Sequence, residues 1–178
     1  GGWRSRSEIN IMTKHFLEIE NLAKRCPGKD GELTVFENAN FGIEKGEFVC
    51  IIGHSGCGKS TIMNVLAGLY RPEQGSISLK GRKIELRSPR DAIRHGIGMV
   101  HQHRKLIPAH TVIENILLGH PRAGRVLNLR DTESEILALC QKYDFNIDLY
   151  AKVWQISEGE KQVVEILKAL YRGAEILI

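Results

Sequence analysis

Gly53-His-Ser-Gly-Cys-Gly-Lys-Ser-Thr61 fits the phosphate-loop pattern G-x-x-x-x-G-K-[S/T] at every defined position. The apolar run Glu47-Phe-Val-Cys-Ile-Ile52 precedes it and has the composition of a buried parallel strand. A glycine-rich turn that binds nothing is the alternative, but strand, loop and helix come in the order in which this motif binds polyphosphates. The loop is followed by apolar residues at helical spacing: Ile62, Val65, Leu66 and Leu69.

The residue types of this loop suit an anionic ligand. Glycine lets the backbone turn tightly and bring its N–H groups against a polyphosphate, and the positive end of the following helix faces the same anion. Lys59 has the reach to contact the β- and γ-phosphates, and the Ser60 hydroxyl suits Mg²⁺. We assign the side chains of His54 and Cys57 no chemistry, because the motif leaves their positions variable. The candidate nucleotide contacts are Gly53, His54, Ser55, Gly56, Cys57, Gly58, Lys59, Ser60 and Thr61.

The composition is that of a globular protein. Of 178 residues, 42% are hydrophobic and 26% charged, which predicts one domain. The formal net charge of +4 is mildly basic, and scattered lysines and arginines are more typical of a solvated face than of a nucleic-acid site. No run approaches the ~18 apolar residues that span a bilayer, so we expect any membrane link to come through a partner. Residues 1–11, ahead of Met12, are interpreted as a disordered leader or tag.

Metal-binding and disulfide patterns are weak. The cysteines form no C-x-x-C pair, and Cys50 falls in the predicted strand, so we expect reduced thiols. The pair His101 and His103 has no evident third ligand, and we expect no metal there. The four cysteines are Cys26, Cys50, Cys57 and Cys140.

Short alternating runs before the loop predict an antiparallel flap beside a nucleotide-binding core. Apolar runs predict further strands of a buried sheet that includes residues 47–52. A turn is expected over residues 26–31. The flap strands are expected over 16–20 and 33–43, two short strands around Gly81 over 76–80 and 83–85, and the further core strands over 96–100 and 175–178.

Helix starts are marked by capping residues. Ser88 followed by Pro89 predicts a short helix that runs to about His95. Gly173 is expected to end the last helix. Three capping boxes predict three more helix starts, at Thr111-Val-Ile-Glu114, Thr132-Glu-Ser-Glu135 and Ser157-Glu-Gly-Glu160.

The phosphate loop, Gln102 after a strand, and the helix start at Ser157 come in the order and rough spacing of an ABC-type ATPase. From about Phe16 to Ile178 the chain resembles the nucleotide-binding subunit of a prokaryotic ABC importer. The resemblance implies an α/β P-loop NTPase fold with a RecA-like core, an N-terminal antiparallel β-subdomain and an inserted α-helical subdomain. It implies a single, C-terminally truncated domain over 12–178, with the helical subdomain over about 103–160, and ATP with Mg²⁺ as ligands.

The stretch Ile156-Ser-Glu-Gly-Glu160 is similar to the family signature Leu-Ser-Gly-Gly-Gln. In the family this signature contacts the γ-phosphate of the ATP held by the opposite subunit, so Ser157 and Gly159 are candidate nucleotide contacts. The extra carboxylates of Glu158 and Glu160 weaken the local preference for an anion. The resemblance also implies Gln102 as the catalytic candidate, which contacts the attacking water and, together with Ser60, the Mg²⁺ ion.

The resemblance implies a role in coupling ATP binding and hydrolysis to solute uptake. The implied partners are transmembrane permease subunits and a second ATP-binding subunit, arranged head to tail in a homodimer or heterodimer. The implied location is peripheral, on the cytoplasmic face of the cell membrane. ATPases of DNA repair or chromosome organisation share the loop and the signature, but the span from Gln102 to Ser157 has no room for a coiled coil. The sequence shows no basic helix with interleaved aromatic residues either, and we expect no nucleic-acid partner.

The chain departs from the family pattern in three places. The part up to about Leu69 resembles nitrate, sulfonate or bicarbonate importers, whereas the part from about Tyr70 resembles sugar or nucleoside importers, which suggests a recombinant. Cys26 stands where the family stacks an aromatic residue on adenine, and Phe36 is the candidate substitute. The family's Mg²⁺-binding Asp, water-polarising Glu and later His would follow Ile178. The resemblance therefore leaves ATPase activity open, and we expect hydrolysis near background. The alternative is a truncated or recombinant fragment that binds nucleotide weakly and has no catalytic role.

Overall fold

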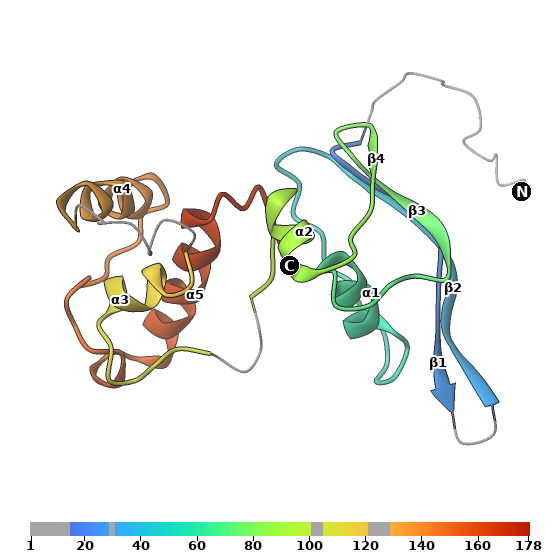
Figure 1. Ribbon diagram of the computed structural model, residues 1–178, viewed down its shortest axis with the longest axis horizontal. Helices are drawn as coiled ribbons and strands as arrows, with labels where there is room; N and C mark the ends of the chain where they lie inside the picture. Colours follow the sequence, from blue (N-terminus) through green and yellow to red (C-terminus); the bar gives the residue numbers. More distant parts are fainter. Residues whose placement is uncertain (1–14, 29–30, 101–104, 121–128) are drawn as a thin grey trace, which may run out of the picture. The chain divides into compact units, whose positions relative to one another are not determined.

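The computed structural model describes residues 15–28, 31–100, 105–120 and 129–178 (Figure 1). The chain divides into two compact units. Unit 1 comprises Gly1–Ile62 and Arg71–Glu85, and unit 2 comprises Met63–Tyr70 and Leu86–Ile178. Helix α1 (Lys59–Leu66) begins in unit 1 and ends in unit 2.

Unit 1 contains an antiparallel sheet with the strand order β2-β1-β3-β4. β1 (Leu17–Gly28) and β2 (Gly31–Ile43) form a long hairpin, β3 (Gln74–Leu79) pairs with the other edge of β1, and β4 (Arg82–Ile84) follows beside β3 (Figure 1). The antiparallel flap predicted over 16–20 and 33–43 is therefore confirmed, and the short strands predicted over 76–80 and 83–85 belong to the same sheet. Its buried side chains include Leu17, Ile19, Leu22, Ile77 and Leu79.

The β1–β2 hairpin is longer than the sequence predicts. A turn is expected over residues 26–31, but Cys26 lies opposite Leu33 in the ladder, which continues to Gly28 opposite Gly31. The pairing of β1 with β3 ends earlier, at Ala23. Beyond that point β1 has a neighbour on one side only, and such an edge accommodates Pro27 although proline lacks an N–H group.

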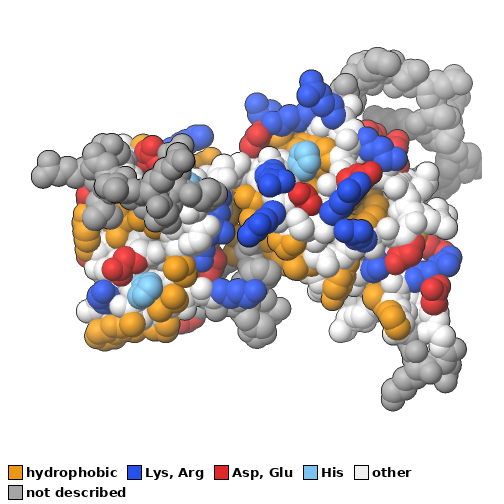
Figure 2. All heavy atoms as spheres, viewed as in Figure 1, with side chains coloured by type: hydrophobic (Ala, Val, Ile, Leu, Met, Phe, Trp, Pro, Cys, Tyr) orange, Lys and Arg blue, Asp and Glu red, His pale blue; other side chains and the backbone are white. Residues whose placement is uncertain are grey.

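The prediction of a strand over residues 47–52 is wrong. The segment is neither strand nor helix, and Phe48 and Ile52 are 93% and 88% exposed. Cys50 is also exposed, contrary to its predicted burial. A strand requires a neighbour that satisfies its N–H and C=O groups, and no strand in the described part of the chain pairs with this run. Hydrophobic side chains accordingly contribute to the molecular surface, as the visible face in Figure 2 illustrates.

Unit 2 contains a parallel strand pair. β5 (Ile97–Gly98) pairs with β6 (Ile176–Leu177). The Val100 N–H donates to the Ile178 carbonyl at 2.8 Å and extends this pairing. The core strands predicted over 96–100 and 175–178 are therefore confirmed, as shorter elements.

The helices of unit 2 are α2 (Pro89–Arg94), α3 (Val112–Leu117), α4 (Leu129–Lys142), the 3-10 helix η2 (Val153–Gln155) and α5 (Glu158–Tyr171). All of them except α2, which packs beside β5, contribute to an apolar cluster. Both α3 and α4 pack against α5. This cluster fixes where α5 begins, because its buried members come from α3, α4, α5 and the segment before α5: Val112, Ile113, Ile116, Leu117, Ile136, Cys140, Leu149, Val153, Ile156, Val164 and Leu167.

Most of the predicted helix caps are confirmed. The Ser88 side chain accepts a hydrogen bond from the Asp91 N–H, and both Thr111 and Ser157 form complete capping boxes. Gly173, with φ +85°, lies just beyond the end of α5 as expected. The box predicted at Thr132 is wrong, because α4 has already begun at Leu129 and Thr132 is buried inside the helix. None of the described helices is long and apolar enough to cross a bilayer.

Candidate functional site

The phosphate loop lies in unit 1 and leads directly into α1. Gly56 and Gly58 have φ values of +82° and +92°, a region that L side chains rarely adopt. At Gly58 a side chain would also be crowded, because a Cβ atom there would lie 3.2 Å from the Val35 carbonyl oxygen. Both positions therefore require glycine, Gly58 for space against β2 as well as for its φ value.

Lys59 folds its side chain back over this loop. Its Nζ donates to the carbonyl oxygens of Gly53 at 2.5 Å and His54 at 2.9 Å, and lies 3.5 Å from the Cys57 Sγ. These contacts hold the ammonium group at the loop itself. An anion bound there would meet a positive charge that is already in position.

The start of α1 adds a second source of positive potential. The first N–H groups of a helix have no intrahelical acceptor, and the first turn of α1 contains no acidic residue that would oppose an anion. Ser60 stands in this turn and is exposed. Its hydroxyl suits a hard cation such as Mg²⁺. The N–H groups at the start of α1 therefore suit a polyphosphate, and the Ser60 hydroxyl suits the Mg²⁺ bound to it.

Phe36 lies beside the loop, a placement that the sequence did not reveal. It stands in β2 and is half-buried. Its Cδ1 atom would lie 3.3 Å from a Cβ atom on Gly58. Cys26 stands in β1, opposite Leu33. The aromatic ring beside Gly58 is therefore supplied by β2, because the hairpin brings residues 35 and 36 against the loop.

The second candidate site is the N-terminus of α5 in unit 2. The Ser157 hydroxyl accepts a hydrogen bond from the Glu160 N–H at 3.3 Å, and the Glu160 carboxylate accepts one from the Ser157 N–H at 2.7 Å. Glu158 is paired with Lys161 at 2.7 Å. Ser157 and Gly159 are exposed, and beyond the adjoining residues and backbone of α5 itself no described atom lies within 4 Å of the Cβ position of Gly159. This helix tip can therefore be approached from solution.

The carboxylate at this tip is held in its charged form. The hydrogen bonds from the side chain and then the backbone of Ser157 lower the pKa of Glu160 below its ordinary value of 4.5. The equivalent Glu114 in the Thr111 box also has a lowered pKa, through the Thr111 backbone and side chain and the charge of Lys152. Both boxes therefore depend on an ionised carboxylate.

We expect the substitution Glu160→Gln to flatten the acid dependence of stability. Because the pKa of Glu160 is lower in the folded chain, its box stabilises the fold above the unfolded value near 4.5, and this stabilisation is lost as the pH falls through the folded value. Glutamine accepts the same Ser157 hydrogen bond at neutral pH without titrating. Urea unfolding between pH 7 and pH 3.5 should show Glu160→Gln to be less stable than the wild type at pH 7, where the ionised carboxylate contributes, and this difference should shrink as the pH falls. Equal acid loss in the two proteins would contradict the assignment, and Glu158→Gln is the matched control.

The structure leaves the predicted site residues in three groups. The phosphate loop belongs to unit 1, whereas Ser157 and Gly159 belong to unit 2. Gln102, His101 and His103 lie outside the described residues. Within the part of the chain that is described, no group of three or more His, Cys, Asp or Glu side chains could hold a metal ion.

Unit 2 also contains a pocket that sequence reasoning missed. Its volume is about 360 Å³, and α2 and α5 both contribute walls. Apolar walls include Ala92, Ile93 and Ala169, and three cationic side chains with one carboxylate complete it: Lys105, Lys168, Arg172 and Glu165. Burial lowers the pKa of Lys168 below its ordinary value of 10.5, although Glu165 opposes this shift. The lining residues come from separate stretches of sequence, so no local sequence pattern predicts the pocket.

Comparison with known proteins agrees with this geometry. A glycine-lined loop that carries an inward-folded lysine at the start of a helix defines a nucleotide-binding protein of the P-loop class. A protein-family model described as "ABC transporter" matches residues 36–178. The chain belongs to the ABC transporter family.

Curated relatives match most of this chain but extend well beyond it. The glucose import ATP-binding protein of Haloferax volcanii is 41% identical over 94% of this chain and 35% of its own length. The guanosine import ATP-binding protein of Bacillus subtilis is 42% identical over 93% of this chain and 32% of its own length. The chain thus spans about a third of these relatives.

Solved structures share the fold. A dimeric bacterial ABC transporter cassette, 28% identical, matches 90% of this chain and 72% of its own with a TM-score of 0.72. Another ATP-binding cassette of an ABC transporter, 23% identical, matches 93% of this chain and 68% of its own with a TM-score of 0.77. The α/β P-loop fold expected from the sequence is confirmed by these matches.

Proposed function

We propose that the chain is the ATP-binding part of an ABC importer, which couples ATP binding and hydrolysis to solute uptake through a membrane permease. The observation that carries this proposal is the glycine-lined loop with the Lys59 ammonium folded over it at the start of α1. The names of the glucose and guanosine import relatives support the direction of transport.

In the proposed complex the loop binds the phosphates of ATP. Lys59 exchanges contacts with its own loop carbonyls for contacts with phosphate oxygens, and the Ser60 hydroxyl ligates Mg²⁺. When bound, the metal neutralises charge on the phosphate oxygens. Gln102 is the residue proposed to contact the metal and the attacking water.

Ser157 and Gly159 are proposed to act on the nucleotide of a second copy. The exposed hydroxyl and bare backbone at the tip of α5 suit a phosphate oxygen, and the dimeric state of a related cassette supports a head-to-tail pair. Glu158 is already paired with Lys161, which reduces the repulsion between this tip and an anion. The proposed location of the assembly is the cytoplasmic face of the membrane.

The pocket between α2 and α5 is proposed to receive a segment of the permease. Its apolar walls suit an apolar side chain, and its three cationic side chains suit acidic residues beside that side chain. Ile93 lies on the wall of the pocket and is 42% exposed, so it remains available to a partner.

A thermal-shift experiment tests the nucleotide-binding half of this proposal. A ligand that binds only the folded chain, at 100 times its dissociation constant, should raise the unfolding midpoint by about 5 °C or more. We expect Mg²⁺-ATP to do so, and gel filtration should separate a folded species from an aggregate. A broad transition that nucleotide does not move would favour the fragment alternative.

We expect Phe36→Ala to weaken the binding of ATP several-fold more than that of inorganic tripolyphosphate. The ring lies against Gly58 and is half-buried, so part of its face is available to a base while the phosphates occupy the loop. Competition titrations with the two ligands would measure this difference. Equal losses would mean that Phe36 supports the loop backbone, and Phe41→Ala in the same strand is the control.

A further inference from the structure

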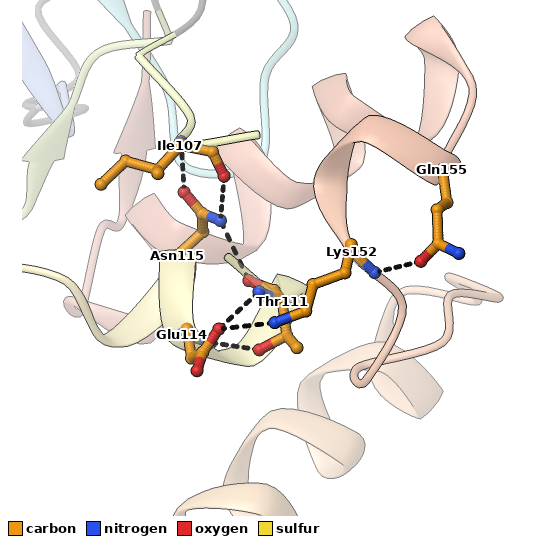
Figure 3. A network of polar contacts seen from close by, with 6 residues as sticks. All are labelled: Ile107, Thr111, Glu114, Asn115, Lys152 and Gln155. Carbon is orange, nitrogen blue, oxygen red and sulfur yellow. Dashed lines mark hydrogen bonds and ion pairs between the residues drawn. The ribbon is translucent and has the colours of Figure 1, made fainter. Parts of the chain in front are cut away.

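Asn115 is a buried polar side chain in the apolar cluster of unit 2, with an exposure of 0%. Its Oδ1 accepts a hydrogen bond from the Ile107 N–H at 2.7 Å, and its Nδ2 donates to the carbonyl oxygens of Ile107 at 3.1 Å and Thr111 at 2.9 Å (Figure 3). One amide group therefore fastens both backbone groups of Ile107 and the backbone just before α3. It closes the segment from Ile107 to Thr111 into a fixed loop.

The fastened segment is paired on its other side with the chain that leads to α5. The Val153 N–H donates to the His110 carbonyl at 3.0 Å, and the Trp154 N–H donates to the Pro108 carbonyl at 3.2 Å. In the opposite direction, the Val112 N–H donates to the Ala151 carbonyl at 3.0 Å. These bonds make a short antiparallel ribbon, in which Thr111 lies opposite Lys152.

Side chains reinforce this ribbon where the two segments meet. Glu114, which closes the Thr111 capping box, lies 3.7 Å from the Lys152 Nζ (Figure 3). The Lys152 N–H donates to the Gln155 side chain at 2.9 Å. Ser157 follows Gln155 by two residues, so the ribbon runs without a break into the tip of α5.

We propose that Asn115 is a positioning residue for the Ser157 site. By holding residues 107–111 it fixes their ribbon partners, 152–154, and through them sets the position and orientation of the α5 tip. This inference rests on the proposed function in one respect, which is that Ser157 meets a nucleotide held by a second copy.

The chemistry of asparagine suits this task. One backbone N–H group and two backbone carbonyl oxygens need partners at this buried point. A primary amide supplies an oxygen that accepts from the N–H group and a nitrogen that donates to both carbonyls. Leucine has a similar volume but would leave the Ile107 N–H and two carbonyls without these bonds. Aspartate would retain the acceptor but place a carboxylate against two carbonyl oxygens.

Hydrogen exchange of the full chain tests the positioning role without nucleotide. We expect Asn115→Leu to accelerate exchange of the Val153, Trp154 and Ser157 amides at least tenfold more than exchange at Leu167, in the middle of α5. The matched control is Ile116→Val, a substitution at the neighbouring fully buried position that touches none of these hydrogen bonds. The control should accelerate the four amides equally.

Self-association in ATP and Mg²⁺ supplies the functional readout. In sedimentation experiments Asn115→Leu should weaken the ATP-dependent dimer at least tenfold and leave the affinity for ATP itself unchanged, whereas Ile116→Val should affect neither. If Asn115→Leu does not fold, Asn115→Asp takes its place, with acceleration of the same amides expected.

Unchanged protection of Val153, Trp154 and Ser157 in a folded Asn115 variant would overturn the inference. Equal effects of Asn115→Leu and Ile116→Val would overturn it as well, because they would mean that Asn115 contributes only to stability. Failure of the wild-type chain to bind ATP would count against the proposed function alone, since the exchange pattern decides the role of Asn115 separately.

Discussion

Lys59→Ala is expected to weaken ATP binding by about 100-fold, which corresponds to the loss of strong charge-assisted hydrogen bonds at a phosphate. The Lys59 Nζ is held over the loop by the Gly53 and His54 carbonyls, so its charge is present before the ligand arrives. Alanine removes that charge and leaves the loop with its backbone N–H groups and the start of α1 as its sources of positive potential. Titration with a fluorescent ATP analogue would measure the change.

The control for this prediction is Lys83→Ala. Lys83 is an exposed lysine in β4 of the same unit, outside the loop, and its removal changes the net charge by the same amount. We expect it to alter ATP affinity less than twofold at physiological salt. If the Lys59 and Lys83 variants bind ATP with equal affinity and both unfold at the wild-type temperature, the loop is not the nucleotide-binding site.

Ile93→Glu is expected to reduce association with the permease by at least about 30-fold, the loss typical of a central interface residue. The substitution places a charge on an apolar wall of the pocket between α2 and α5 and gives the pocket's own cationic groups a competing partner. Binding of ATP should be unchanged. Co-purification with permease subunits expressed in the same cells, followed by affinity measurement in detergent, would test it.

Leu137→Glu is the matched control for the pocket. Leu137 stands in α4, is 43% exposed, and is not among the pocket residues. The same apolar-to-acidic change there should leave the permease affinity unaltered. If both variants retain the permease, the pocket is not its docking surface; if both lose it, the charge acts through stability.

The sequence predicted those features that local chemistry determines. The phosphate loop needs only its own residues and the helix that follows. The boxes at Thr111 and Ser157 close between residues three apart, and both formed as expected. The strand alternation over residues 16–20 likewise identified the inward face of β1, where Leu17 and Ile19 are buried.

The errors have a common physical cause, which is dependence on distant neighbours. Residues 47–52 have the composition of a buried strand, but a strand also requires a partner, and composition does not supply one. Residues 132–135 match the capping-box sequence pattern, but α4 begins before them, at Leu129. Phe36 could not be placed beside Gly58 from sequence, because the length and register of the β1–β2 hairpin decide that contact.

Isothermal titration of the purified chain with ATP in the presence of Mg²⁺ tests the central claim most directly. The glycine-lined loop and the poised Lys59 predict saturable heat with a stoichiometry near one nucleotide per chain, and an affinity about 100-fold lower in Lys59→Ala. A folded wild-type chain that gives no binding heat at any temperature tried, and no nucleotide-dependent rise in its unfolding midpoint, would contradict it.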